Sequence, residues 1–116
     1  VGAANLRLTV DVLHMVRNGD TVAHVAALDP ALIDYAQISD GPAEADADAH
    51  AMEALCDRGL PGEGVFPLTD LIRVLPEATT VCIEAPMQRY SASMTPLERA
   101  ALARRATMAL LHRAGR

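Results

Sequence analysis

The stretch "LRLTVDVLH", residues 6–14, decides the fold class, because its apolar and polar residues alternate as they do along a β-strand. The apolar residues would share one face of this strand, and Asp11 would stand near its end on the opposite face. The next segment, "GDTVAHVAAL" at residues 19–28, is predicted to be a helix with Asp20 as its N-cap. A strand followed by a helix is the repeating unit of α/β proteins.

The same order occurs twice more along the chain. A strand is predicted in "IDYAQISD", residues 33–40, which the loop-forming Gly41-Pro42 follows, and another in "TTVCIEAP", residues 79–86, which Pro86 ends. Strands that alternate with helices pair in parallel through right-handed crossovers. The sequence therefore predicts an α/β protein with about three βα units, either a layered sheet or a part of a (β/α)8 barrel.

Further helices are predicted from composition and spacing. A segment rich in Ala and Asp is expected to be helical from about Ala43, and leucines at helical spacing indicate a helix in residues 67–76. The last helix is expected to begin after Thr95, because Pro96 suits its first position and Glu98 completes a capping box. The stripe of this helix that is predicted to be buried consists of Leu97, Ala101, Met108 and Leu111.

Each predicted strand carries a polar residue toward its carboxyl end, namely Asp11, Gln37 and Glu84. The carboxyl ends of parallel strands meet at one edge of a sheet, where ligands bind. Two carboxylates and an amide oxygen, with His14 nearby, are hard ligands for a divalent cation. The alternative is that Asp11 and Glu84 only cap the following loops and that the Gln37 amide only bonds to the backbone. Three at equivalent positions favour a site, because carboxylates buried together without a cation are costly.

The segment "RGLPGEG", residues 58–64, places Arg58 at the head of a loop that contains three glycines and a proline. Glycine allows a positive φ and proline fixes φ, so the backbone of this loop is expected to be tightly defined. The segment does not open a helix directly after a strand, which disfavours the usual phosphate-binding loop.

Length and charge narrow the functional classes. The 116 residues suffice for one modest domain. A net charge of −5 disfavours nucleic acid and anionic membranes as partners. No apolar run approaches the roughly 20 residues that a membrane-spanning helix needs, and the N-terminus does not look like a secretory leader. We therefore expect a cytoplasmic protein.

Four motifs in order, "LTVDVLHMVRNGD", "IDYAQISDGP", "RGLPGEGVFPLTDLI" and "TVCIEAP", resemble the C-terminal part of the sugar phosphate isomerase/epimerase family, the xylose isomerase-like TIM barrels. The resemblance implies that residues 1–116 are the C-terminal portion of a single TIM barrel domain and contain its strands six to eight. A whole barrel needs about 250 residues, so the chain would form only a partial (β/α)8 barrel.

The resemblance also implies roles for particular residues. Asp11, Gln37 and Glu84 would bind a divalent metal ion, which is Mn, Mg, Co or Zn, and Glu84 would also be a catalytic acid/base. His14 and Arg58 would bind the substrate. A fourth metal ligand of the family, a Glu on the fifth strand, falls outside this sequence. The chain alone is therefore expected to be inactive.

The implied activity is isomerisation or epimerisation of a small sugar or polyol-derived substrate, through proton abstraction next to a carbonyl and an enediolate. Gln37 stands where sugar epimerases usually have His, and resembles instead a dehydratase branch that includes 3-dehydroshikimate dehydratase. A related DNA-repair endonuclease is disfavoured by the acidic balance. A non-catalytic α/β interaction module and association into a homo-oligomer stay open.

Overall fold

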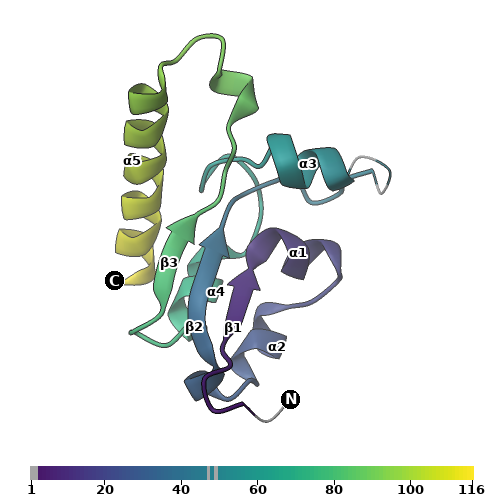
Figure 1. Ribbon diagram of the computed structural model, residues 1–116, viewed down its shortest axis with the longest axis vertical. Coiled ribbons are helices and arrows are strands. Elements are labelled where there is room, and N and C mark those ends of the chain that lie inside the picture. Colours follow the sequence, from purple (N-terminus) through teal and green to yellow (C-terminus); the bar gives the residue numbers. More distant parts are fainter. Residues whose placement is uncertain (1–2, 47, 49) are drawn as a thin grey trace.

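The computed structural model describes residues 3–46, 48 and 50–116. Its centre is a parallel sheet with the strand order β1-β2-β3, formed by β1 (Leu8–Asp11), β2 (Ile33–Ile38) and β3 (Thr80–Ile83). All three strands point the same way in Figure 1. Asp11 pairs with Gln37, and Gln37 pairs with Cys82. The predicted parallel α/β arrangement is confirmed.

Helices cover one face of this sheet, one of its edges and the carboxyl ends of its strands. In Figure 1, α4 lies behind the strands, α5 lies beside β3, and α3 lies beyond their carboxyl ends. No helix of the described residues lies in front of the strands in this view. The helices are α1 (Val12–Arg17), α2 (Val22–Ala26), α3 (His50–Cys56), α4 (Leu68–Val74) and α5 (Pro96–Ala114), with short 3-10 helices η1 (Pro30–Leu32) and η3 (Gln88–Tyr90).

The main core lies between the helices and one face of the sheet. Ala36 and Ile38 of β2 are fully buried there against Leu71 and Ile72 of α4 and Leu110 of α5. Along each strand, the residues that alternate with these core residues occupy the other face of the sheet. Because Thr9 pairs with Tyr35 and Asp11 with Gln37, this second face carries the polar residues of the strand ends.

The first strand is shorter than predicted, because Asp11 ends it by capping a helix. The Asp11 carboxylate accepts a hydrogen bond from the backbone N–H of Leu13 at 3.0 Å, and α1 begins directly at Val12. For α2 the predicted cap, Asp20, is wrong. Thr21 caps this helix, because its hydroxyl accepts from the backbone N–H of His24 at 3.3 Å.

The helix predicted from about Ala43 is present but begins later, since residues 43–46 are not helical and α3 begins at His50. Arg17 donates to the backbone carbonyls of Pro42 and Ala43, at 3.0 and 3.3 Å. These carbonyls accept hydrogen bonds from a side chain of α1. In a helix they would instead accept from backbone N–H groups of the same helix. Residues 47 and 49 of the predicted helix lie outside the described residues.

The last helix begins as predicted, but only part of the predicted stripe is buried: Leu111 is half-buried and packs against the main core. Thr95 and Glu98 form the capping box, and Gly115 ends α5 with a φ of 87°. Leu97 of the predicted stripe is 80% exposed, and Met108 is exposed as well. Ala103 and Leu110 are buried, because α5 turns this side toward α4 and β3.

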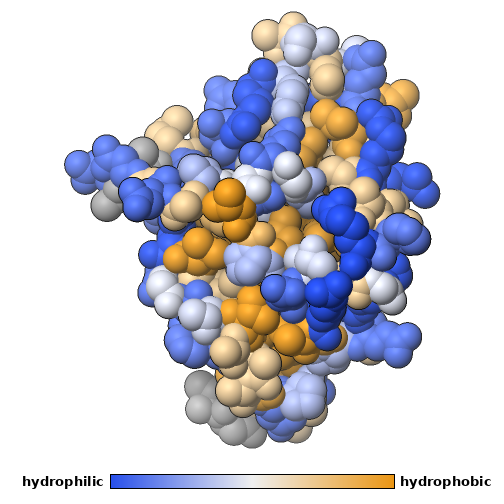
Figure 2. Space-filling view, turned by 180° about the vertical axis from the view of Figure 1, so that it is seen from behind, coloured by the Kyte–Doolittle hydropathy of each residue, from blue (hydrophilic) through white to orange (hydrophobic). Residues whose placement is uncertain are grey.

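Figure 2 shows the molecule from behind, where hydrophobic residues gather over the middle of the face and hydrophilic residues lie along its margins. Among the residues that the structure describes, no helix is both long enough and apolar enough to cross a membrane.

Candidate active site

Asp11, Arg58 and Glu84 meet at the carboxyl ends of the strands. Nη1 of Arg58 donates to both carboxylate oxygens of Asp11, at 3.1 and 2.9 Å. Nη2 of Arg58 lies 3.7 Å from Oε1 of Glu84. Arg58 is only 4% exposed, so its charge is compensated by the two carboxylates rather than by water. The sequence predicted Asp11 and Glu84 at one edge of the sheet, and the structure brings both together with Arg58.

Gln37 lies on the same face of the sheet as Asp11, because the two residues pair in register across neighbouring strands. Glu84 directly follows β3, and its backbone N–H donates to the carbonyl of Ile38 at 2.9 Å. One carboxylate oxygen of Glu84, Oε2, is buried and has no hydrogen-bond partner among the described residues. A buried acceptor without a donor is costly, so this oxygen is available for a ligand.

Tyr35 and Cys82 continue the polar face behind these residues. A hydrogen bond with the Cys82 thiol raises the pKa of Tyr35 above its ordinary value, and burial and the nearby charge of Glu84 raise it further. The tyrosine is thus neutral at physiological pH.

His14 stands beside the cluster on α1, and not in the strand that was predicted for residues 6–14. Its Nε2 lies 3.7 Å from Oδ2 of Asp11, and its side chain is about half exposed. The His14 ring meets the ring of His50 edge to face, with 5.6 Å between centroids. His14 and Asp11 line a hollow of about 450 Å³ together with residues of α1 and α2. The histidine is therefore accessible from this hollow.

An ion pair that local sequence patterns did not indicate joins α1 to α3. Nε and Nη2 of Arg17 donate to the two carboxylate oxygens of Glu53, at 2.8 and 2.6 Å. Hydrogen bonding with Arg17 lowers the pKa of Glu53 below its usual value, and hydrogen bonding with Glu53 raises the pKa of Arg17. Residue Ala54, next to Glu53, accepts from Nε of Arg58 at 2.8 Å. The pair therefore fixes the helix that supports Arg58.

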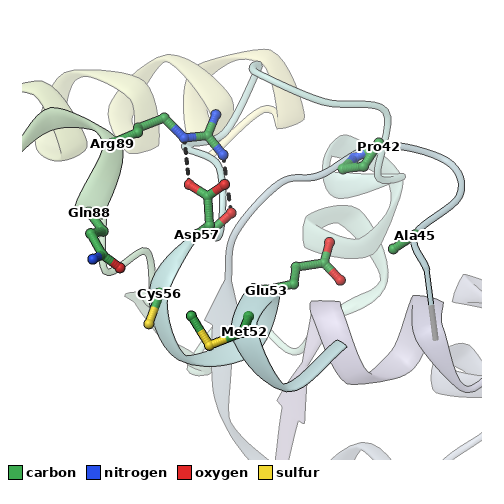
Figure 3. A pocket seen from close by; sticks show the side chains of 8 residues that line it. All are labelled: Pro42, Ala45, Met52, Glu53, Cys56, Asp57, Gln88 and Arg89. Carbon is green, nitrogen blue, oxygen red and sulfur yellow. Dashed lines mark hydrogen bonds and ion pairs between the residues drawn. The ribbon is translucent and has the colours of Figure 1, made fainter. Parts of the chain in front are cut away.

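A larger hollow, of about 650 Å³, lies between α3 and η3 (Figure 3). Nε of Arg89 donates to the Asp57 carboxylate at 2.8 Å, and a second guanidinium nitrogen donates to the Asp57 carbonyl at 3.1 Å. None of the predicted site residues lines this hollow. We place the candidate site at the strand ends and not here, because the predicted site residues Asp11, Arg58 and Glu84 converge at the strand ends.

The oxygen atoms at the strand ends are of the kind that binds a divalent cation, and the fourth ligand expected from the resemblance falls outside this sequence. Asp11, Gln37 and Glu84 supply carboxylate and amide oxygens, and Oε2 of Glu84 is the buried oxygen without a partner. Within the described part of the chain, no group of three or more His, Cys, Asp or Glu residues is arranged to hold a metal ion. The assignment of the three metal ligands thus remains a prediction.

Comparison with solved structures places the fold among known proteins. The chain is similar to the crystal structure of an IOLI protein with a bound zinc atom, with a TM-score of 0.75 and 21% identity over 96% of this chain and 39% of that chain. It is also similar to a xylose isomerase domain protein from Alicyclobacillus acidocaldarius subsp. acidocaldarius, with a TM-score of 0.70 and 27% identity over 99% of this chain and 40% of that chain. No protein-family model and no curated protein matches the sequence.

Proposed function

We propose a function on the premise that this chain has the fold of part of a xylose isomerase-like TIM barrel, as its motifs predicted and its structural neighbours confirm. The chain spans about 40% of the length of each neighbour. In our proposal it supplies three βα units of a complete barrel, and the other strands come from the same polypeptide. The complete barrel is a divalent-metal-dependent isomerase or epimerase of a small sugar or polyol-derived substrate.

The convergence of Asp11, Arg58 and Glu84 at the strand ends carries this proposal. Asp11, Gln37 and Glu84 would hold the metal ion, and the zinc in the IOLI neighbour supports a metal in this fold. A divalent ion bound there supplies Lewis acidity, which makes the C–H bond beside a carbonyl more acidic.

The residues of this chain would perform the remaining tasks. Glu84 accepts the proton from the carbon next to the carbonyl, through a carboxylate that is only partly solvated. Arg58 orients a substrate oxygen, since its planar guanidinium is fixed by Ala54 and Asp11 before the substrate arrives. His14 binds a substrate hydroxyl from the accessible side of Asp11. Return of the proton to the other face gives an epimer, and return to the neighbouring carbon gives an isomer.

A dehydratase of the 3-dehydroshikimate type is the second candidate. Gln37 at the seventh-strand position favours it, and Arg58 offers a guanidinium that suits a substrate carboxylate. The first step is the same proton abstraction, and a β-hydroxyl group then leaves. The two candidates therefore differ in the product and not in the first residue that acts.

The test compares the complete barrel, loaded with Mn²⁺, on a series of ketoses in D₂O and on 3-dehydroshikimate. An isomerase or epimerase incorporates solvent deuterium into its sugar product, whereas a dehydratase produces the absorbance of an aromatic compound. Glu84→Gln should reduce either activity at least 100-fold, and the matched control Glu77→Gln changes an exposed glutamate and should retain it. Full activity of Glu84→Gln would refute the assignment of the proton acceptor.

A further inference from the structure

We infer that Asp40 is a positioning residue, which holds residues 59–66 in the shape that presents Arg58 to the strand ends. Asp40 is 3% exposed, and its carboxylate accepts three backbone hydrogen bonds. Oδ1 accepts from the N–H of Gly41 at 2.9 Å and from that of Phe66 at 3.0 Å. Oδ2 accepts from the N–H of Gly62 at 2.8 Å. One carboxylate thus binds the middle and the end of the loop.

The backbone of Asp40 binds the beginning of the same loop. Its N–H donates to the carbonyl of Gly59 at 2.8 Å, and its carbonyl accepts from the N–H of Gly59 at 2.8 Å. The two residues form an antiparallel bridge outside the main sheet. Arg58 directly precedes Gly59, so the bridge fixes the backbone from which the arginine side chain extends.

Two glycines of the loop are required by its backbone path, one by a close approach to Asp40 and one by a positive φ. A Cβ atom at Gly64 would lie 2.2 Å from the carbonyl oxygen of Gly41 and 2.5 Å from Oδ1 of Asp40. Gly62, which donates to Oδ2, has a φ of 98°, a conformation that other residues rarely adopt. The glycine pattern and the aspartate therefore belong to one arrangement, in which the loop closes around a carboxylate.

The charge of Asp40 is stabilised by N–H groups and not by a cation. In the described ranges, no Arg, Lys or His nitrogen lies within 4.0 Å of the Asp40 carboxylate. Hydrogen bonds from N–H groups to a carboxylate are stronger than bonds between neutral groups, and backbone N–H groups in such loops form concave anion sites. The loop is thus built around an anion that the protein itself supplies.

The loop fixes the backbone of Arg58, and α3 holds its side chain. Nε of Arg58 donates to Ala54 at 2.8 Å, and Nη1 donates to Asp11. A loop that loses its anchor to Asp40 shifts the backbone of Arg58 relative to Asp11 and Glu84. Under the proposed function, on which this step rests, the loss of alignment weakens substrate binding more than it slows the chemical step.

The experiment uses Asp40→Asn, Asp40→Ala and the control Asp70→Asn, which changes an exposed aspartate. In Asp40→Asn the amide retains one acceptor oxygen but places an NH₂ group opposite one of the loop N–H donors. Hydrogen exchange of the Gly62 and Phe66 amides and the Nε–H signal of Arg58 are followed by NMR. We expect exchange at Gly62 to accelerate at least tenfold in Asp40→Asn and the Arg58 signal to shift, with helix amides of α5 unchanged.

These NMR readouts do not require activity, so they separate this inference from the proposed function. If the Gly62 amide and the Arg58 signal match those of the wild type in Asp40→Asn, the inference is overturned. It is also overturned if exchange accelerates equally in α5, because Asp40 then serves stability alone. In the complete barrel we expect Asp40→Asn to raise KM about tenfold with kcat within about twofold. Should Asp40→Ala fail to fold, Asp40→Asn decides.

Discussion

Replacement of Glu53 by Gln tests whether the ion pair with Arg17 fixes α3. The two side chains are 10% and 12% exposed, and their bidentate contact has distances of 2.8 and 2.6 Å. Glutamine has nearly the same shape but leaves the guanidinium without its carboxylate. Because the pair is mostly buried, loss of one partner should lower the free energy of unfolding by about 3 kcal/mol at neutral pH.

The dependence of this effect on pH follows from the pKa of Glu53, which Arg17 lowers below the usual 4.5. A carboxylate whose pKa is lower in the folded state stabilises the protein fully above the pKa of the unfolded state. This stabilisation is lost as the pH falls through the folded-state pKa. The difference between wild type and Glu53→Gln should therefore be constant above about pH 5 and shrink below about pH 4.5.

Urea denaturation of both proteins at pH 7 and pH 3 measures these quantities. With a slope of about 1.5 kcal/mol per molar urea, the expected loss lowers the midpoint by about 2 M at pH 7. Asp70→Asn is the matched control, because its exposed pair with Arg73 should contribute less than about 0.5 kcal/mol. A midpoint that falls by less than about 0.5 M at pH 7, or a difference that grows on acidification, would refute the reasoning.

Two further predictions concern α5. Thr95→Ala removes the hydroxyl that accepts from the backbone N–H of Glu98 at 3.3 Å, and should lower the free energy of unfolding by about 1 kcal/mol in urea denaturation; no loss would show that the capping box is not stabilising. Leu110→Ala removes a fully buried side chain and should cost about 3 kcal/mol, whereas Leu97→Ala changes an exposed one and should cost less than about 0.5 kcal/mol. Equal losses in the two variants would show that the side of α5 that carries Leu110 is not the buried side.

The strands and the strand-end residues were predictable because their signals are local. Period-2 alternation identified the first strand, and Gly41-Pro42 and Pro86 marked the ends of the other two. Parallel pairing then placed Asp11, Gln37 and Glu84 at one edge. The short helix α1 was missed because no breaker separates it from β1. Asp20 and Thr21 are both good N-caps, so residue type alone did not show that Thr21 and not Asp20 caps α2.

Other features depend on contacts between distant parts of the chain. Helix α5 is rich in alanine on several sides, so hydrophobic spacing did not distinguish the side that carries Ala103 from the side that carries Leu97. Arg17 and Glu53 are 36 residues apart, and Asp40 reaches an amide 26 residues away. Pairings over such separations leave no periodic signal. The hints of Asp40 were its place before Gly41 and its presence in the motif "IDYAQISDGP" that carries the family resemblance.

The metal content of the purified complete barrel tests the central claim most directly. It is measured by elemental mass spectrometry after incubation with Mn²⁺ and desalting, beside Asp11→Asn and the exposed control Asp70→Asn. The account predicts about one equivalent of divalent metal in the wild type and in the control, and less than about a tenth of that content in Asp11→Asn. No retained metal in the wild type, or equal metal in Asp11→Asn, would contradict the strand-end site and favour a non-catalytic interaction module.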